Sequence, residues 1–214
     1  MAEKFKAPRG TFDVLPQAMA RRELLLRTAA DVFARAGYDW AATPGFEDTG
    51  LFERGVGKST DIVRKEMFTF EDKGGRSLTL RPEGTAPICR AYVEHGMHKL
   101  AQPVKLAYAG PFFRHERPQA GRYRQFHQLG AEAIGSDSPL ADAEVITLLS
   151  DLVEELGVPG VELRLSSLGS LDARREYLGE LKSHLHSRED ELSDDVRERI
   201  ELNPLRAFDS DHEG

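Results

Sequence analysis

Cysteine, tryptophan and long apolar runs are nearly absent from this sequence of 214 residues, which has one cysteine and one tryptophan. A lone cysteine, Cys89, cannot form an intrachain disulfide, so the sequence predicts a fold held by its core in a reducing cytoplasm. The sequence has no run of about eighteen apolar residues, so we expect no membrane-spanning helix. The opening MAEKFKAPRG has no apolar stretch behind its charges, so we expect no secretory signal.

Two common ligand sites are also incomplete. GVGKST, residues 55–60, has the ending of a phosphate-binding loop, but the position of the first glycine is Phe52 and no apolar strand precedes it. We therefore interpret it as a glycine-rich surface loop. The pairs His95/His98 and His184/His186 have no supporting cysteine or aspartate cluster, so we predict solvated or capping roles and no metal site.

Charge is unevenly distributed along the chain. The net charge is −7, and residues 187–214 contain ten Asp/Glu and four Arg, a balance of −6. Residues 114–124 instead hold four Arg and one Glu, a balance of +3. An acidic protein can still bind a polyanion through such a local basic stripe.

Apolar spacing and turn residues predict helices mixed with antiparallel strands. We expect helices at 16–37, 83–94, 138–157 and 171–185, a hairpin at 67–83, extended chain at 38–42, two long strands at 104–116 and 121–135, and a short strand at 161–165. This order lacks a βαβ repeat, so it predicts an α+β fold with a mixed, mainly antiparallel sheet flanked by helices.

The two long strands carry the most informative residues. Because residues of one parity share a strand face, one face of each strand is polar and aromatic; these faces carry Tyr108, Gly110, Phe112 and Arg114, and Arg122, Arg124, Phe126, Gln128, Gly130 and Glu132. His127 lies on the opposite face, and we expect it to pack there. If the two polar faces coincide, guanidinium groups suit phosphate, a ring suits a base, and the carboxylate suits an ammonium group. Taken singly, an arginine-rich hairpin is commonly a solvated edge and a strand aromatic is commonly part of the core. Polar groups on a face that should be buried are not explained by packing, however, because they need hydrogen-bonding partners. This favours a binding site.

The stretch GPFFRHERPQAGRYRQFHQLGAE resembles motif 2 of the class II aminoacyl-tRNA synthetases. Together with SLTLRPEGTA and KAPRGTFDVLP, it is specifically similar to the histidyl-tRNA synthetase family of bacterial type, and the segment up to Pro44 resembles motif 1 of the class. The resemblance covers essentially the whole chain. It implies the class II catalytic fold, ATP with substrate-bound Mg²⁺, histidine and tRNA-His as partners, and a homodimer built by motif 1.

The resemblance also implies roles for individual residues. The catalytic Arg114 contacts the α-phosphate, and the acids take the α-amino group of histidine. The matching positions are Arg114, Glu116, Arg122 and Phe126 for ATP, and Glu83, Thr85, Gln128 and Glu132 for histidine. Phe126 packs on adenine, Glu116 and Arg122 hold the adenine and phosphate ends of the nucleotide, and the loop 117–121 touches the acceptor end of the tRNA. The resemblance also leaves a secondary role for Lys58, because the corresponding segment of the family approaches the substrates.

Several parts of the family's pattern are missing, including motif 3, the imidazole-reading segment and the anticodon-binding domain. We therefore expect residues 1–170 to be the front of a catalytic domain and 171–214 the start of an insertion region, in a fragment that is inactive alone and prone to associate through its open sheet edge. Two alternatives stay open: a synthetase-like regulatory subunit of histidine biosynthesis, and a truncated paralogue that only dimerises. The intact arginine-rich run 122–128 favours the ligase.

Overall fold

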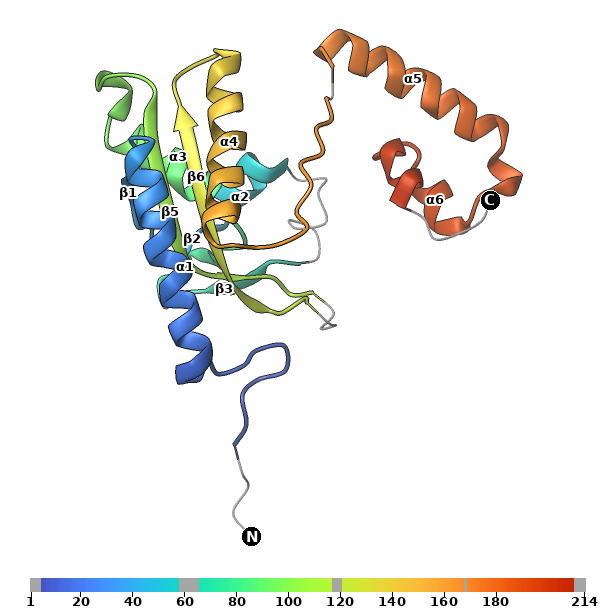
Figure 1. Ribbon diagram of the computed structural model, residues 1–214. Helices are drawn as coiled ribbons and strands as arrows, with labels where there is room; N and C mark the ends of the chain where they lie inside the picture. The colour runs from blue at the N-terminus through green and yellow to red at the C-terminus, as the bar shows by residue number, and fades with distance from the viewer. Residues whose placement is uncertain (1–4, 58–65, 117–120, 168, 210–214) are drawn as a thin grey trace. The chain divides into compact units, whose positions relative to one another are not determined.

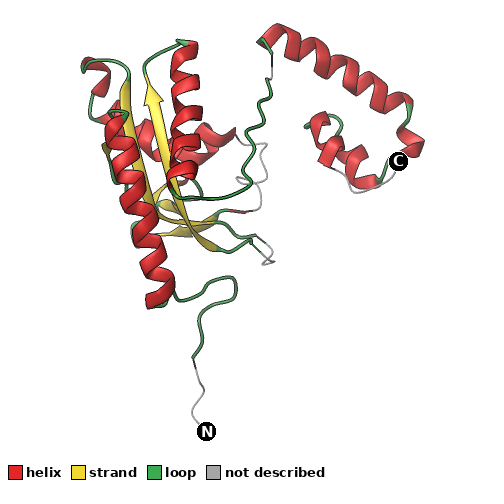
Figure 2. Cartoon of the chain, viewed as in Figure 1, coloured by secondary structure: helices red, strands yellow, loops and turns green. Residues whose placement is uncertain are grey.

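The computed structural model describes residues 5–57, 66–116, 121–167 and 169–209 (Figures 1 and 2). The helices and strands in chain order are α1 (Pro16–Arg35), β1 (Asp39–Trp40), β2 (Phe46–Asp48), α2 (Thr49–Phe52), β3 (Phe68–Glu71), β4 (Ser77–Leu80), α3 (Thr85–Glu94), β5 (Val104–Phe113), β6 (Gln125–Ile134), α4 (Pro139–Glu155), α5 (Leu171–Ser187) and α6 (Asp194–Arg199). The chain forms two compact units, 1–161 and 162–214.

The described residues of the first unit form two three-stranded sheets, in the orders β1-β5-β6 and β2-β4-β3. β5 and β6 pair antiparallel over ten residues each, whereas the short β1 runs parallel to β5. β4 pairs antiparallel with both β2 and β3. The sheets flanked by helices agree with the predicted mixed, mainly antiparallel α+β fold.

Helices cover both faces of the β5–β6 ladder. α1 and α4 lie side by side against one face (Figure 1), where Phe33, Leu148 and Leu152 pack with the odd-numbered Ala107 of β5. On the other face, Ile88 of α3 packs with Leu106, Tyr108 and Phe112. We call these the helix-packed face and the α3 face. Because side chains alternate along a strand, two different cores form on one ladder.

The boundaries of α1 and α4 follow from local sequence. Pro16 and Pro139 occupy the first turns, where a missing N–H costs nothing because that group has no partner inside the helix. Ser138 caps α4, since its hydroxyl accepts a hydrogen bond from the Leu140 N–H. The buried side of α1 holds Ala29, Val32 and Phe33, and burying a large apolar side chain such as Phe33 contributes about 1.5–3 kcal/mol.

The second unit is helical, and polar contacts link its parts. Leu185 of α5, Val196 of α6 and Ile200 are buried. Glu201 accepts hydrogen bonds from Lys182 at 2.9 Å and pairs with His186 at 2.9 Å. These contacts, first with Glu201 and then with Glu189, raise the pKa of His186. His186 therefore ties α5 to the segment after α6.

One predicted strand is wrong. Residues 161–165 have the alternating pattern of a half-buried strand, but Val161, Leu163 and Leu165 are exposed and form no strand. A strand needs a neighbour to satisfy its backbone groups, and within the described ranges this segment has none. In GVGKST, the part up to Gly57 belongs to one wide helical turn, 53–57, and not to an open loop. Lys58 and the rest of the motif lie outside the described residues.

Candidate active site

The register of the β5–β6 ladder decides whether the predicted polar faces coincide. Tyr108 lies opposite Gly130, Gly110 opposite Gln128, and Phe112 opposite Phe126. Residues paired in this way point to the same side of a sheet. The even-numbered side chains of both strands therefore share the α3 face, and the expectation of one common surface is confirmed for the residues that lie within β5 and β6.

A hydrogen-bonded chain joins three of the predicted histidine-binding residues. Thr85, the first residue of α3, donates from its hydroxyl to Glu132 Oε1 at 2.7 Å. The Tyr108 hydroxyl donates to the same oxygen at 3.3 Å, and Gln128 Nε2 donates to the Tyr108 oxygen at 3.3 Å. The chain links α3, β5 and β6, so these side chains hold one another in place.

Glu83 stands beside this network at the start of α3. Its carboxylate accepts hydrogen bonds from the backbone N–H groups of Thr85 at 2.6 Å and Ala86 at 3.1 Å, which suits an anion at a helix N-terminus. Burial raises the pKa of Glu83, the two backbone hydrogen bonds oppose the shift, and the negative charge of Glu132 adds to it. Glu83 and Glu132 are therefore close enough to repel each other.

No Lys or Arg in the described part of the chain forms an ion pair with Glu83 or Glu132. The same two charges, after burial, raise the pKa of the Cys89 thiol, one turn along α3 from Thr85. Neighbouring carboxylates without a cation are unfavourable, because each disfavours the charged form of the other. This part of the surface can accept a positively charged group.

Glycines make room for the Tyr108 ring. A Cβ atom at Gly84 would come within 2.2 Å of the ring, and one at Gly130 within 2.3 Å. Real Cβ contacts are never that short, so only glycine fits at these two positions while the ring stays in place. Burial and then the charge of Glu132 raise the pKa of Tyr108 to about 12, so the hydroxyl keeps its proton at neutral pH.

Arg114 and Phe126 form the second part of the site. Arg114 Nε donates to the carbonyl oxygen of Pro82 at 3.0 Å, and its guanidinium carbon lies 5.2 Å from the centre of the Phe126 ring. That distance is within the range of a cation–π contact. Because Pro82 directly precedes Glu83, the guanidinium group and the carboxylates belong to one continuous surface.

Arg81 also contacts this surface, next to Phe112. It is a buried arginine whose guanidinium carbon lies 4.4 Å from the centre of the Phe112 ring, and Phe112 neighbours Phe126 at 6.3 Å between ring centres. Arg81 also donates to the carbonyl oxygens of Pro111 and Thr43, both at 3.0 Å. It therefore fixes the end of β5, directly before Arg114.

Glu116 and Arg122 lie at the open end of the ladder. Arg122 Nη1 is 3.6 Å from Glu116 Oε2, longer than a hydrogen bond, and the Arg122 side chain is 65% exposed. That Glu116 oxygen is buried and has no hydrogen-bond partner among the described residues. β6 begins only at Gln125, so the predicted strand face does not extend to Arg122 and Arg124. Of the loop 117–121, residues 117–120 lie outside the described residues.

His127 was expected to pack on the helix-packed face, and this expectation is wrong. The side chain is exposed, and its Nε2 lies 3.1 Å from Arg22 Nη1 of α1. Partial burial, then the charges of Arg22 and Arg81, lower the pKa of His127. The neutral ring can accept a hydrogen bond from Arg22, so it connects α1 to the strand that carries Gln128.

Sequence reasoning missed two residues of this surface. Tyr108 was placed on the correct face but given no role, and Arg81 was not considered. Tyr108 has a usable signal, because it shares the parity of Arg114 and lies across from a glycine. Arg81 has none, because its partners at Thr43 and Pro111 are distant in sequence.

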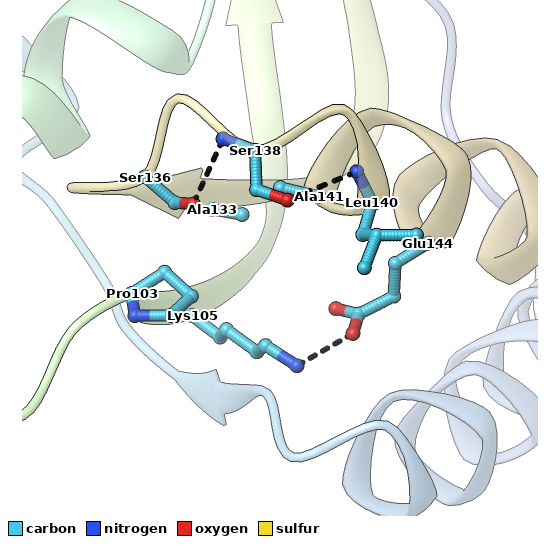
Figure 3. Close-up of a pocket in the computed structure, with 8 residues that line it drawn as sticks. All are labelled: Pro103, Lys105, Ala133, Ser136, Ser138, Leu140, Ala141 and Glu144. Atoms are coloured by element: carbon cyan, nitrogen blue, oxygen red, sulfur yellow. Dashed lines mark hydrogen bonds and ion pairs between the residues drawn. The ribbon is translucent and has the colours of Figure 1, made fainter.

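The helix-packed face contains a hollow of about 240 Å³ at the end of the ladder, between β5, β6 and the start of α4 (Figure 3). Lys105 and Glu144 meet across it at 2.7 Å. Its charges are therefore already paired, unlike those around Glu132. Within the described ranges, no group of three or more His, Cys, Asp or Glu side chains is placed to hold a metal ion. No helix among them is long and apolar enough to cross a membrane.

The sequence profile described as histidyl-tRNA synthetase matches residues 10–191. A histidine–tRNA ligase from Halothermothrix orenii is 52% identical over 208 residues, covering 97% of this chain and 50% of the relative. The apo histidyl-tRNA synthetase from S. aureus superposes with a TM-score of 0.75 at 37% identity, covering 95% of this chain and 48% of that one. An ATP phosphoribosyltransferase regulatory subunit/histidyl-tRNA synthetase from Bacillus halodurans has a TM-score of 0.63 at 30% identity, covering 74% and 40%.

The chain spans about half the length of the curated relatives that it matches. Its sheets and helices are those of the class II synthetase fold of the S. aureus enzyme. The profile match extends over both motif regions and the ladder with Arg114, Gln128 and Glu132. The chain belongs to the histidyl-tRNA synthetase family.

Proposed function

We propose that this chain provides the histidine- and ATP-binding surface of a histidine–tRNA ligase. The observation that carries the proposal is the pair of carboxylates, Glu83 and Glu132. Both contact Thr85 and interact through their charges without a Lys or Arg partner in the described structure, and the surface continues to Arg114 and Phe126. The ammonium group of an amino acid is a cation of suitable size for this position. A triphosphate beside Arg114 would bring the two reactants together.

In the proposed reaction, an oxygen of the histidine carboxylate attacks the α-phosphorus of ATP, and the bond from that phosphorus to the bridging oxygen breaks. Pyrophosphate leaves with the electron pair, and histidyl-adenylate remains. The chain needs no nucleophile of its own for this step. Arg114 offsets charge on the α-phosphate, while Glu83, Thr85, Gln128 and Glu132 orient the amino acid. The Mg²⁺ of this reaction is the ion carried by ATP, and no residue of the chain is assigned to it.

The acceptor of the histidyl group in this proposal is tRNA-His, in the cytoplasm where tRNA is charged. The balance of +3 over residues 114–124 supports contact with a polyanion. A homodimer through α1 is supported by exposed apolar side chains on that helix, at Met19, Leu24 and Leu25. We retain residues 1–170 as the front of the catalytic domain and 171–214 as the start of an insertion region.

Ligand binding to the chain tests the proposal. Titration with histidine and with ATP, followed by amide NMR, should shift resonances of residues on the α3 face. Arg114→Ala should weaken ATP binding at least about tenfold, because a charge-assisted contact is lost. Arg76→Ala is the matched control, since this exposed arginine lies in the β3–β4 turn and pairs with Asp72. Equal loss in both variants would contradict a specific role for Arg114.

Catalysis by the chain alone is a separate question. We expect histidine-dependent exchange of pyrophosphate into ATP to be absent or very slow in the isolated chain. Exchange that requires histidine and disappears in Arg114→Ala would overturn that expectation while supporting the assignment of Arg114.

The similarity to the Bacillus halodurans protein favours one second candidate, a regulatory subunit that binds histidine without charging tRNA. The two functions differ in their use of ATP. A ligase surface binds ATP through Arg114 and Phe126, whereas a histidine sensor needs only the carboxylate pair. Histidine binding with no detectable ATP binding would favour the regulatory subunit.

A further inference from the structure

The hydroxyl group of Tyr108 determines where the protons of the site network lie. It carries one proton and lies between an acceptor, Glu132 Oε1, and the side-chain amide of Gln128. An ionised carboxylate can only accept hydrogen bonds, so the tyrosine proton is directed to Glu132. Thr85, which also neighbours the tyrosine hydroxyl, gives its own proton to Glu132 at 2.7 Å. The tyrosine oxygen is therefore left to accept from Gln128, and an amide donates through its nitrogen.

We propose that Tyr108 is a positioning residue that holds the Gln128 amide in one orientation, so that the site offers oxygen acceptors to the ammonium group of the amino acid. The nitrogen and the oxygen of a side-chain amide are bonded to the same carbon and point in different directions within one plane. When the nitrogen is bound to Tyr108, the carbonyl oxygen is turned away from the tyrosine and stays available. The proposal deepens the function proposed above and rests on it.

The resulting arrangement favours a positively charged ligand. Glu132 keeps one oxygen outside the contacts with Thr85 and Tyr108, and the Gln128 carbonyl and the Glu83 carboxylate are also acceptors. A ligand with N–H donors and a positive charge satisfies all of them. An inverted Gln128 would present its N–H group instead, and this donor would repel an ammonium group.

Two features keep the tyrosine in this role. Its ring fills the space left open at Gly84 and Gly130, so the hydroxyl has little freedom to move. The high pKa of Tyr108, about 12, keeps the hydroxyl protonated. In the opposite arrangement, Tyr108 would donate to the Gln128 carbonyl, and no proton would lie between the tyrosine oxygen and Glu132 Oε1, 3.3 Å apart, so these two oxygens would repel each other.

The first test needs no ligand. In the wild-type chain, nuclear Overhauser contacts should connect the Gln128 Nε2 protons with the Tyr108 ring, and their absence would overturn the proposal. Tyr108→Phe keeps the ring and removes the hydroxyl, and it should speed exchange of the Gln128 side-chain amide protons at least about fivefold. Tyr38→Phe is the matched control, because Tyr38 is also a buried tyrosine but packs with the helix-packed core. Equal exchange rates in the two variants would also overturn the proposal.

The second test measures selectivity. L-histidine and 3-(imidazol-4-yl)propionate differ by the ammonium group. The ratio of their dissociation constants therefore measures how much the ammonium group contributes to binding. Tyr108→Phe should reduce the preference for histidine at least about tenfold, and Tyr38→Phe should leave it unchanged. An unchanged ratio in Tyr108→Phe would overturn the proposal. If the wild-type chain shows no preference, the proposed histidine site fails, and the ligand-free amide measurements still decide the role of Tyr108.

Discussion

The two faces of the β5–β6 ladder each place a buried tyrosine near a glutamate, but they treat the glutamate charge differently. On the helix-packed face, Tyr38 lies close to Glu144, and Lys105 pairs with that carboxylate at 2.7 Å. On the α3 face, Tyr108 donates to Glu132, and no Lys or Arg of the described chain pairs with it. The paired carboxylate of Glu144 contributes to the fold, whereas the carboxylate of Glu132, which has no cationic partner, is available to bind a ligand.

The largest expected effect is on stability, and it belongs to the helix-packed face. Leu152→Ala should lower the free energy of unfolding by about 2–5 kcal/mol, because it leaves a cavity in the core between α4 and the ladder. Urea denaturation measures the change. Leu149→Ala on the same helix is the control, with an expected change within about 0.5 kcal/mol, since Leu149 is 61% exposed and Leu152 is 5% exposed. Similar losses in both variants would contradict the assigned core.

The two buried tyrosines should respond alike to alkaline pH, although their faces differ. Burial is the first cause that raises the pKa of each to about 12. A folded-state pKa above the ordinary value of 10 means that the contribution to stability is complete below pH 10 and is lost as pH rises from 10 to 12, by up to about 2 kcal/mol for each tyrosine.

Absorbance at alkaline pH and urea denaturation at pH 9 and 11 would measure this loss. Tyr38→Phe and Tyr108→Phe should each lose less stability than the wild type between the two pH values. A variant that loses as much as the wild type would show that its tyrosine is not shifted, and would separate the two faces.

Glu132→Gln should sharpen the contrast in charge. It removes the negative charge opposite Glu83, so histidine affinity should fall about tenfold, while stability should stay level or rise because the repulsion disappears. Glu144→Gln on the other face should do the reverse. It breaks the Lys105 ion pair, lowers stability by about 0.2–1 kcal/mol and leaves histidine affinity unchanged. Calorimetric titration and urea denaturation of both variants provide the comparison.

The smallest expected effect lies where α1 meets β6. Arg22→Ala removes the contact with His127 and one positive charge beside it, so the pKa of His127 should rise, with a change in stability below about 1 kcal/mol. NMR titration of the imidazole protons checks the shift. A pKa that stays as low as in the wild type would mean that burial and the charge of Arg81 set it without Arg22.

Short-range patterns in the sequence predicted much of the fold. The period of two along the predicted strands 104–116 and 121–135 predicted the shared polar face of the part that forms the ladder, because the strand pleat is a local property. The helix spacing with Pro16 and Pro139 predicted α1 and α4 for the same reason. The parallel pairing of β1 with β5 and the strand β2 went unpredicted, since pairing over a long sequence separation has no local signal.

The candidate site shows the same limit. The residues on the ladder and at Glu83 could be named from the resemblance to a family, and their roles remain predictions. The proton order through Tyr108 required the register of the ladder. The supporting place of Arg81 required contacts with Thr43 and Pro111. The exposed segment at 161–165 was mistaken for a strand because periodicity alone does not reveal whether a pairing partner exists.

The ring of Tyr108 between Gly84 and Gly130 has a consequence for how this protein tolerates change. A mutational survey that alters one codon at a time would score both glycines as intolerant, although the obstacle is a third side chain. Replacing the tyrosine with a smaller residue would free space at both glycines at once. Substitutions at these three positions therefore depend on one another, and redesign of the amino-acid pocket must change them together.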